Sequence, residues 1–338
     1  MPTGVRRSRA DFGTFRPRRR TLLVWVGLVS SGVFAYLAVR NVDFEQVWRA
    51  LQECSYWTLV PALVLIALAN VVRAWRWQLQ FHEETRPRFG PALSALLIGS
   101  FFNNVLPARA GEAAQVLALR RSSQASVSET AATVLLGRAY DVLSVLLLLF
   151  VLAPWLPHVT WLSAAVYLAV GLVLGLLLVV VIGHRWRSVA LRWLVRIPFL
   201  SPEQAQSAGA GLWRGLISLR HPKKAAIALG LTTLSWVLFG ISNWFVLEGF
   251  SLGLSPLAGI LISIALSLAM VIPSAPAAVG VFEAAVLVAL KPYGVPKAEA
   301  LSAGLVIHAL NLFPYVVAGI VCLRLETKDA AGRVSWSR

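Results

Sequence analysis

The sequence predicts an all-α integral membrane protein with six transmembrane helices and two re-entrant helical hairpins. Of its 338 residues, 58% are hydrophobic and 14% are charged, whereas roughly 25% of the residues in soluble domains are charged. Crossing about 30 Å of hydrocarbon takes roughly 20 apolar residues in a helix. Apolar runs close to this length cover residues 21–39, 57–72, 129–153, 161–183, 224–247 and 300–323, and two shorter runs cover 91–105 and 256–272.

The basic residues set the orientation of these segments. Of the 31 Lys and Arg residues, 25 fall in segments that the alternation of apolar runs places on one side. Lys and Arg are enriched in cytoplasmic loops, so residues 1–20 and 324–338 are predicted to be basic cytoplasmic tails of a multi-pass protein of the plasma (inner) membrane. The same rule accounts for the net charge of +16 and requires no nucleic acid partner.

A polar stretch, FFNNVLPARAGEAAQVLALRR, interrupts the apolar pattern at residues 101–121. It ends in Arg120 and Arg121, a second cytoplasmic signature on the far side of a short apolar run. A hairpin that turns near Pro107 and returns to the same side places both of its ends in the cytoplasm, as the distribution of basic residues requires. The break within residues 256–290 must form a second hairpin, entered from outside, so that the C-terminal tail ends in the cytoplasm.

The two breaks share a pattern that predicts an internal repeat. In each, a proline is followed by a glycine and a glutamate, and the next long helix carries two polar residues three positions apart. The matching residues are Pro107, Gly111, Glu112, Arg138 and Asp141 in one half, and Pro276, Gly280, Glu283, His308 and Asn311 in the other. Units at about 57–153 and 224–323 would then have inverted topology within one domain, 21–323, with the prolines and glycines as hinges. Paired broken segments point to a transporter binding site near the membrane midplane, although chance also produces such short patterns.

The polar residues inside the apolar segments are the predicted substrate-binding residues. Arg138 lies about ten residues into its helix, where an ionisable group costs roughly 2.5–3.5 kcal/mol, and Asp141 on the same face would neutralise it. A glutamate in the first turn of a helix also caps free amides, and a buried ion pair or a packed histidine also serves structure alone. The predicted residues are Asn103, Asn104, Arg109, Glu112, Arg138, Asp141, Glu283, His308 and Asn311.

The basic segment 184–223, which joins the two units, alternates arginines with apolar residues at helical spacing. It predicts short helices on the inner leaflet that bind anionic lipids, with a solvated linker as the alternative. The five histidines show no metal-ligand spacing, and no cofactor is expected. Cys54 and Cys322 are placed near opposite faces, so no disulfide is expected.

The chain resembles the lysylphosphatidylglycerol synthase transmembrane, flippase-like family. The resemblance lies in RAWRW at 73–77, the FFNNVLPARAGE run, RAYD at 138–141 and PAAVGVFE at 276–283. It implies two re-entrant hairpins and action on aminoacylated or glycosylated lipid head groups. No soluble aminoacyl-transfer domain follows the last span, so synthase activity is not expected. Gln115 and His308 stand where the pattern leads us to expect arginines, which puts a preference for strongly anionic lipids in doubt.

The leading functional hypothesis is a transporter that moves a polar lipid head group, of an aminoacylated phospholipid or a glycolipid, between leaflets. The alternatives are a small-solute secondary transporter and a non-transporting scaffold for an enzyme of lipid or glycan synthesis. A homodimer or a complex with such an enzyme is also possible. An enzymatic role ranks last, because no nucleophile–base spacing is legible.

Overall fold

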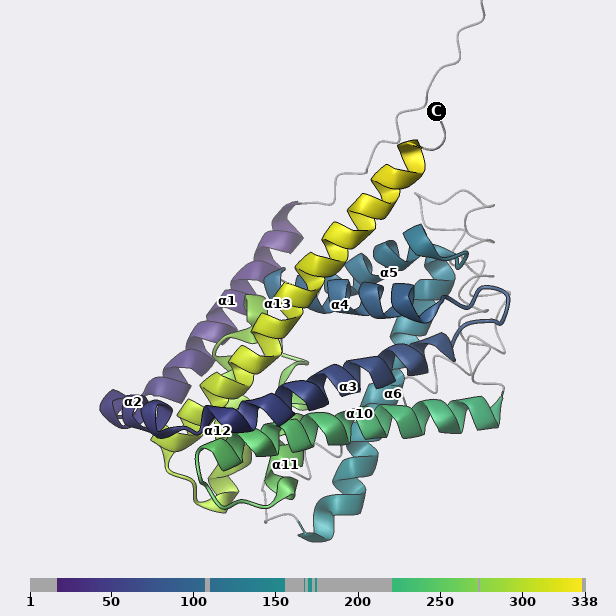
Figure 1. The fold of residues 1–338 in the computed structure, drawn as a ribbon. Coiled ribbons are helices and arrows are strands. Elements are labelled where there is room, and N and C mark those ends of the chain that lie inside the picture. Colours follow the sequence, from purple (N-terminus) through teal and green to yellow (C-terminus); the bar gives the residue numbers. More distant parts are fainter. Residues whose placement is uncertain are drawn as a thin grey trace, which may run out of the picture.

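The computed structural model describes residues 17–106, 110–155, 221–272 and 274–335, with four further helical positions between 167 and 174. All regular structure in these residues is helical, as predicted (Figure 1). Helices long and apolar enough to cross a membrane cover Tyr56–Gln78, Val127–Trp155, Pro222–Gly249, Pro276–Tyr293 and Lys297–Thr327, and a bent pair at Trp25–Val39 and Phe44–Glu53 could add a sixth. The predicted span 161–183 and the segment 184–220 lie almost wholly outside the described residues.

The N-terminal helix α1 (Pro17–Val39) is followed by α2 (Phe44–Glu53) at an angle of 82°. The apolar runs at 21–39 and 57–72 leave residues 40–56 between two predicted spans, and α2 makes most of this connection helical. Asp43 caps α2 by accepting the backbone N–H of Glu45 at 2.9 Å, which satisfies a free donor of the first turn. Val47 packs against Ala298 and Leu301. An apolar stripe on an otherwise polar helix therefore fixes α2 across one end of the bundle.

An extensive antiparallel pair is formed by α3 (Leu59–Gln78) and α10 (Pro222–Gly249), which lie side by side in Figure 1. The backbone N–H of Ser55, just before α3, donates to the Gly249 carbonyl at 2.8 Å. Further along, the Ser242 hydroxyl donates to the Ala62 carbonyl at 3.0 Å. Because residue numbers rise on one helix as they fall on the other, the two helices run in opposite directions.

The first polar break separates α4 (Phe89–Val105) from α5 (Gly111–Ser122), and these helices pack against each other. A Cβ atom at Gly99 would lie 2.7 Å from the Cβ of Gln115, and one at Gly111 would lie 2.5 Å from the backbone N of Asn103. These contacts are also antiparallel, so α4 and α5 form a helical hairpin. Gly99 and Gly111 allow the two backbones to approach closely. Pro107 and Arg109 lie outside the described residues.

The second break lies between α11 (Pro256–Ala269) and α12 (Val281–Leu290), which also pack together. A short 3₁₀ turn, η5 (Pro276–Ala278), connects them, with positive φ at Ala277, Ala278 and Gly280. The stretch Pro276–Tyr293 is by itself long enough to be a candidate span, whereas the charge pattern predicts that it is the returning arm of a hairpin. Helix composition alone is compatible with either arrangement.

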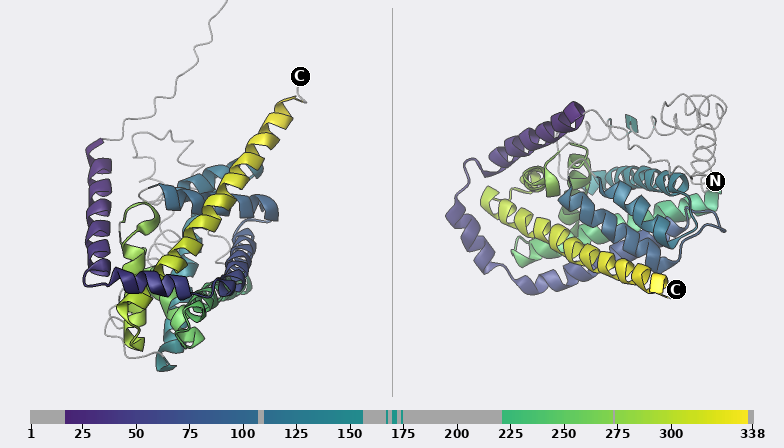
Figure 2. Two further views of the ribbon diagram at one scale, coloured as in Figure 1. Left: turned by 60° about the vertical axis from the view of Figure 1, so that its left-hand side comes forward. Right: turned by 90° about the horizontal axis from the view of Figure 1, so that it is seen from above.

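One long helix completes each half: α6 (Val127–Leu152) follows α5, and α13 (Lys297–Ser335) follows α12. Helix α13 continues beyond the predicted run 300–323 into the basic tail, with Pro314 inside it. Figures 1 and 2 show that α1 begins and α13 ends at the same end of the molecule, opposite α2.

Candidate functional site

An ion pair joins the first hairpin to the long helix that follows it. The Arg138 guanidinium on α6 donates to one oxygen of Glu112 on α5, from Nε at 3.0 Å and from Nη2 at 2.6 Å. The Arg138 side chain is 47% exposed and that of Glu112 is 35% exposed. Because both side chains are partly exposed, another charged or polar group can reach this ion pair.

The closest partner of Asp141 is not Arg138, the partner predicted from the sequence. Its Oδ1 accepts from Arg73 of α3 at 2.9 Å and from the indole N–H of Trp236 of α10 at 3.3 Å. Arg138, the partner predicted from sequence, is 3.7 Å from the other Asp141 oxygen. The Arg73 guanidinium also lies 5.7 Å from the centre of the Trp236 ring, within range of a cation–π interaction. Asp141 thus ties α3, α6 and α10 together.

A third arginine, Arg76, is buried beside this network. Its Nη1 donates to the Gly137 carbonyl at 3.1 Å, and its Nε is buried without a hydrogen-bond partner. A Cβ atom at position 137 would lie 3.1 Å from Nη2, so Gly137 allows the guanidinium to lie against the helix backbone. The described cluster therefore has one positive charge in excess, because Arg73, Arg76 and Arg138 face only Glu112 and Asp141.

The polar face of α13 contacts residues of several other elements. His308 contacts Glu283 of α12, and the Asn311 carbonyl accepts from Asn104 of α4 at 3.5 Å. Tyr315 pairs with Asn70 of α3, whose amide donates to the Tyr315 hydroxyl at 3.0 Å. The sequence placed His308 and Asn311 on one helical face, and this face points into the protein.

Asn103 and Asn104 both have protein partners at the end of α4. The Asn103 side-chain oxygen accepts the backbone N–H of Gly111 at 3.0 Å, so a residue of α4 satisfies a free donor at the start of α5. Asn104 donates to the Ser100 carbonyl at 3.2 Å in addition to Asn311. In this conformation the two amides stabilise the α4–α5 turn and its contact with α13.

Glu283 is the counterpart of Glu112 at the start of α12, and it does cap the helix as its position predicts. Its Oε2 accepts the backbone N–H of Gly280 at 2.7 Å, while its Oε1 lies 2.6 Å from Nδ1 of His308. Both side chains are largely buried, 8% and 10% exposed respectively. Glu283 therefore combines a structural capping bond with a short contact to an ionisable group.

Sequence reasoning did not assign Arg73, Arg76, Trp236 or Asn70 to the site. The RAWRW motif at 73–77, which contains both arginines, contributes to the family resemblance. A usable signal was present, because two arginines near the end of an apolar helix are costly unless they have partners. Their partners on α6 and α10 are far away in sequence, so periodicity within α3 could not identify them.

Comparisons with known proteins agree with these observations. The family model for the lysylphosphatidylglycerol synthase TM region matches residues 24–319. The chain belongs to this family. It is also similar to the UPF0104 membrane protein MJ1078 of Methanocaldococcus jannaschii, with 22% identity over 247 residues, which are 68% of this chain and 95% of that relative. The matched region contains the helix pairs α4–α5 and α11–α12 and the whole cluster around Asp141.

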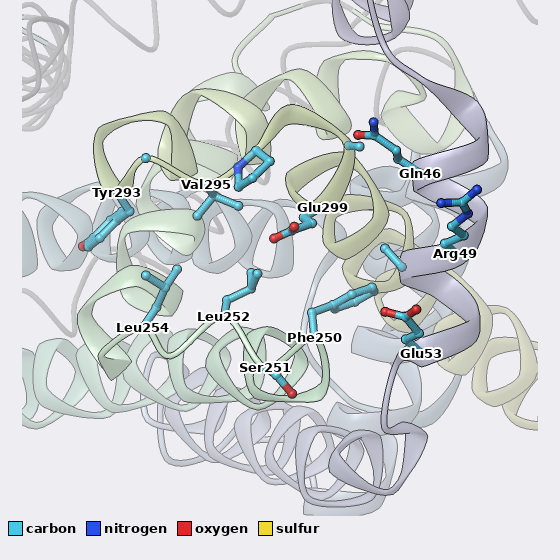
Figure 3. Close-up of a pocket in the computed structure, with 14 residues that line it drawn as sticks. Gln46, Arg49, Glu53, Phe250, Ser251, Leu252, Leu254, Tyr293, Val295 and Glu299 are labelled. Atoms are coloured by element: carbon cyan, nitrogen blue, oxygen red, sulfur yellow. The ribbon is translucent and has the colours of Figure 1, made fainter.

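In this family member, a polar cavity of about 630 Å³ opens at the α2 end of the bundle. Figure 3 shows Gln46, Arg49 and Glu53 of α2 facing Glu299 across it, with Phe250 between the two glutamates. Arg49 is paired with Glu45. The cavity lies at the end of the bundle that the predicted topology places outside. Its lining residues are separate from the cluster around Asp141.

A smaller apolar groove of about 160 Å³ lies between α1, α11 and α12. It is lined by Phe34, Ala265, Leu268, Ala269, Ile272, Val281, Ala284, Ala285 and Val288. Glu283 is on the same helix, α12, as four of the lining residues. Part of this apolar groove is therefore lined by sequence neighbours of Glu283, the residue that contacts His308.

Proposed function

We propose that this protein moves the polar head group of a membrane lipid between leaflets, as a flippase-like transporter of the plasma (inner) membrane with cytoplasmic termini. The observation that carries the proposal is the partly exposed ion pair between Arg138 of α6 and Glu112, which lies in the first turn of α5. A transporter site needs charges that can exchange partners. The buried Arg73–Asp141 pair has more protein partners and is less able to do so.

The chemistry of the pair favours a head group with a phosphate and either an amine or hydroxyls. A phosphate can replace Glu112 on the Arg138 guanidinium, since arginine binds phosphate and carboxylate with the same planar fork. The released Glu112 carboxylate then accepts from an ammonium or hydroxyl group of the same head group. The excess positive charge of the cluster favours the anionic part. Aminoacylated phospholipids and phosphate-linked glycolipids both have this composition.

The arrangement of the helices supports transport by two inverted units. The order long, short, short, long occurs at α3 to α6 and again at α10 to α13. Helices α3 and α10, which begin the two units, are antiparallel, as inverted topology requires. In such transporters, substrate sites lie where broken helices of the two repeats meet. We place the two re-entrant hairpins at α4–α5 and α11–α12.

Leaflet exchange of fluorescent phospholipids and glycolipids in proteoliposomes tests the proposal. Arg138→Gln should lower the exchange rate at least about tenfold, because hydrogen bonds to charged groups contribute roughly 1.5–3 kcal/mol. Glu112→Gln should lower it for lipids with an amine or hydroxyl head group.

Glu83→Gln is the matched control, since it breaks the exposed Lys224–Glu83 pair of 3.1 Å outside the cluster. The hydrogen bond from Lys224 lowers the pKa of the Glu83 carboxyl group. This control should exchange lipid at the wild-type rate.

The alternatives give different results in the same assay. A folded wild-type protein that exchanges no lipid would refute the transporter and favour a scaffold for a lipid-synthesis enzyme. Solute uptake without lipid exchange would favour a small-solute transporter. Covalent change of the labelled lipid would indicate an enzyme, which the proposal does not include.

A further inference from the structure

His308 contacts a hydrogen-bond acceptor through each of its ring nitrogens. Nε2 lies 2.8 Å from the Ala277 carbonyl oxygen, and Nδ1 lies 2.6 Å from Oε1 of Glu283. The ring stacks on Phe282, with centroids 4.3 Å apart and planes 12° apart, which fixes its orientation. The Glu283 carboxyl group is held in turn by the Gly280 N–H at 2.7 Å.

These contacts determine how many protons the pair contains. A backbone carbonyl can only accept, so Nε2 must carry a proton. A hydrogen bond between Nδ1 and Oε1 then needs a second proton, either on the ring as imidazolium or on the carboxyl group. A neutral imidazole facing an ionised carboxylate has only one proton and can satisfy one of the two contacts. The observed geometry is therefore that of the pair with an additional proton bound.

We propose that His308 and Glu283 form a proton-binding site that controls the turn between α11 and α12. When the proton is bound, the pair is neutral overall and both contacts form. When the proton leaves to solvent, a lone pair on one ring nitrogen faces either the carboxylate or the Ala277 carbonyl. One contact must then break.

Few other ionisable groups can act on this pair. Helices α4 and α11 and the turn η5 contain no ionisable side chain, and α12 contains only Glu283. Among residues 25–39 of α1, whose side chains the structure describes, the ionisable side chain is that of Tyr36, which is exposed. On α13 the nearest is Tyr315, which bonds to Asn70. The charged residues of α2 lie beside the start of α13, at the cavity of Figure 3. Lys291 in η6 (Lys291–Tyr293) follows the C-terminal end of α12. The charged residues of α10 lie near the two ends of that helix.

The turn that this proton holds is under backbone strain. Ala277 and Ala278 both have φ of 57°, a left-handed conformation that residues other than glycine rarely adopt. Gly280 has φ of 85°, and a Cβ there would lie 2.5 Å from the Ser31 carbonyl of α1. The Ser31 hydroxyl accepts the Ala275 N–H at 2.8 Å. Loss of the His308–Ala277 bond releases a strained turn that fixes α12 against α1.

This inference deepens the proposed function. The coupling of the proton to lipid movement rests on the proposed function, whereas the proton site itself does not. In the first unit the corresponding contact to Glu112 is made by an arginine, Arg138, instead of a histidine. Its counterpart in the second unit changes with proton occupancy. Release of the proton would allow the second hairpin to move, and rebinding would return it to the conformation described here.

Hydrogen–deuterium exchange of residues 274–282 in the purified full-length protein tests the proton site without any lipid assay. The amides of Ala275, Ala278 and Gly280 are hydrogen-bonded in this turn. With one proton released on opening, the opening equilibrium should rise by up to about tenfold per pH unit over the pH range in which the closed turn binds the proton and the open turn does not. It should level off at higher pH. Comparison with α10 in the same molecule corrects for the intrinsic effect of pH on exchange.

Glu283→Gln is the decisive variant. Its side-chain N–H can donate to a neutral His308 Nδ1, while its oxygen still accepts from Gly280, so both contacts form without a bound proton. We expect its corrected exchange to be independent of pH. If this variant fails to fold, His308→Arg, which donates permanently to both acceptors, should give the same result. A wild-type turn that follows α10 at every pH would overturn the proposal.

Lipid exchange in proteoliposomes between pH 6 and pH 9 then tests the coupling. We expect the rate of the wild-type protein to change with pH, and that of Glu283→Gln to be low throughout, since its turn stays closed. A wild-type rate independent of pH, together with a pH-dependent turn, would refute the coupling and leave the proton site intact. Absence of all lipid exchange would refute the proposed function instead.

Discussion

Glu112 and Glu283 have equivalent positions in the two halves of the chain. Each lies in the first turn of a short helix after a polar break, and each contacts the long helix that follows. Glu112 contacts Arg138, 26 residues later, and Glu283 contacts His308, 25 residues later, each at a shortest distance of 2.6 Å. The repeat predicted from these residues therefore has a counterpart in side-chain contacts. The two partners differ in one property, because arginine keeps its charge and histidine titrates.

The Arg73–Asp141 pair should be a structural brace. Arg73→Leu removes the closest partner of a buried carboxylate, which costs roughly 3–5 kcal/mol of stability. The double variant Arg73→Leu with Asp141→Leu should recover most of this loss, because replacing both members of a buried pair can be neutral. Thermal unfolding in detergent measures both effects. Equal destabilisation by the single and double variants would contradict the brace.

The close approach of α4 and α5 should depend on Gly111. A Cβ at this position would overlap the Gly99 carbonyl oxygen, so Gly111→Ala should destabilise the protein by about 1–3 kcal/mol through overpacking. Gly230→Ala in α10 is the control, since no atom lies within 4 Å of the added Cβ. It should be neutral or stabilise by roughly 0.5–1 kcal/mol. Similar melting temperatures for the two variants would argue against the hairpin contact.

Single-cysteine labelling should determine the topology of the hairpins. Cysteines at Arg88 and Arg121 should react with an impermeant maleimide from the cytoplasmic side, and cysteines at Ser255 and Lys297 from the outer side. Cys54 and Cys322 would first be replaced by alanine. Cys54 should contribute little background in any case, because burial raises the pKa of its thiol. Labelling of the two members of either pair from opposite faces would show that the segment crosses the membrane.

The basic segment 184–223 should bind anionic lipids at the inner leaflet. Each well-placed arginine is worth about 1 kcal/mol near an anionic surface. In nanodiscs of mixed composition, the full-length protein should enrich anionic lipid around it. Exchange of Arg185, Arg187, Arg192 and Arg196 for glutamine should abolish much of this enrichment, as should high salt. Enrichment that survives both changes would place the lipid contact elsewhere.

The sequence by itself determined the helical membrane class, the family and the positions of both breaks. These properties depend on local composition, since an apolar run of sufficient length has few stable alternatives in a bilayer. The alignment of His308, Asn311 and Tyr315 on one face also followed from helical periodicity alone. The position of Glu283 in a first turn likewise predicted its capping bond to Gly280.

Only the tertiary structure decided the partners of the charged residues. Asp141 is three positions from Arg138 in sequence, yet its closest contact is Arg73, on a helix that precedes it by 68 residues. Local spacing shows which side chains share a face, but the choice among partners depends on which helices pack together. The same holds for Arg76 against Gly137 and for His308 between Glu283 and Ala277. Charge pairing inside a membrane is thus set by helix packing, because each buried charge takes the neighbour that packing brings nearest.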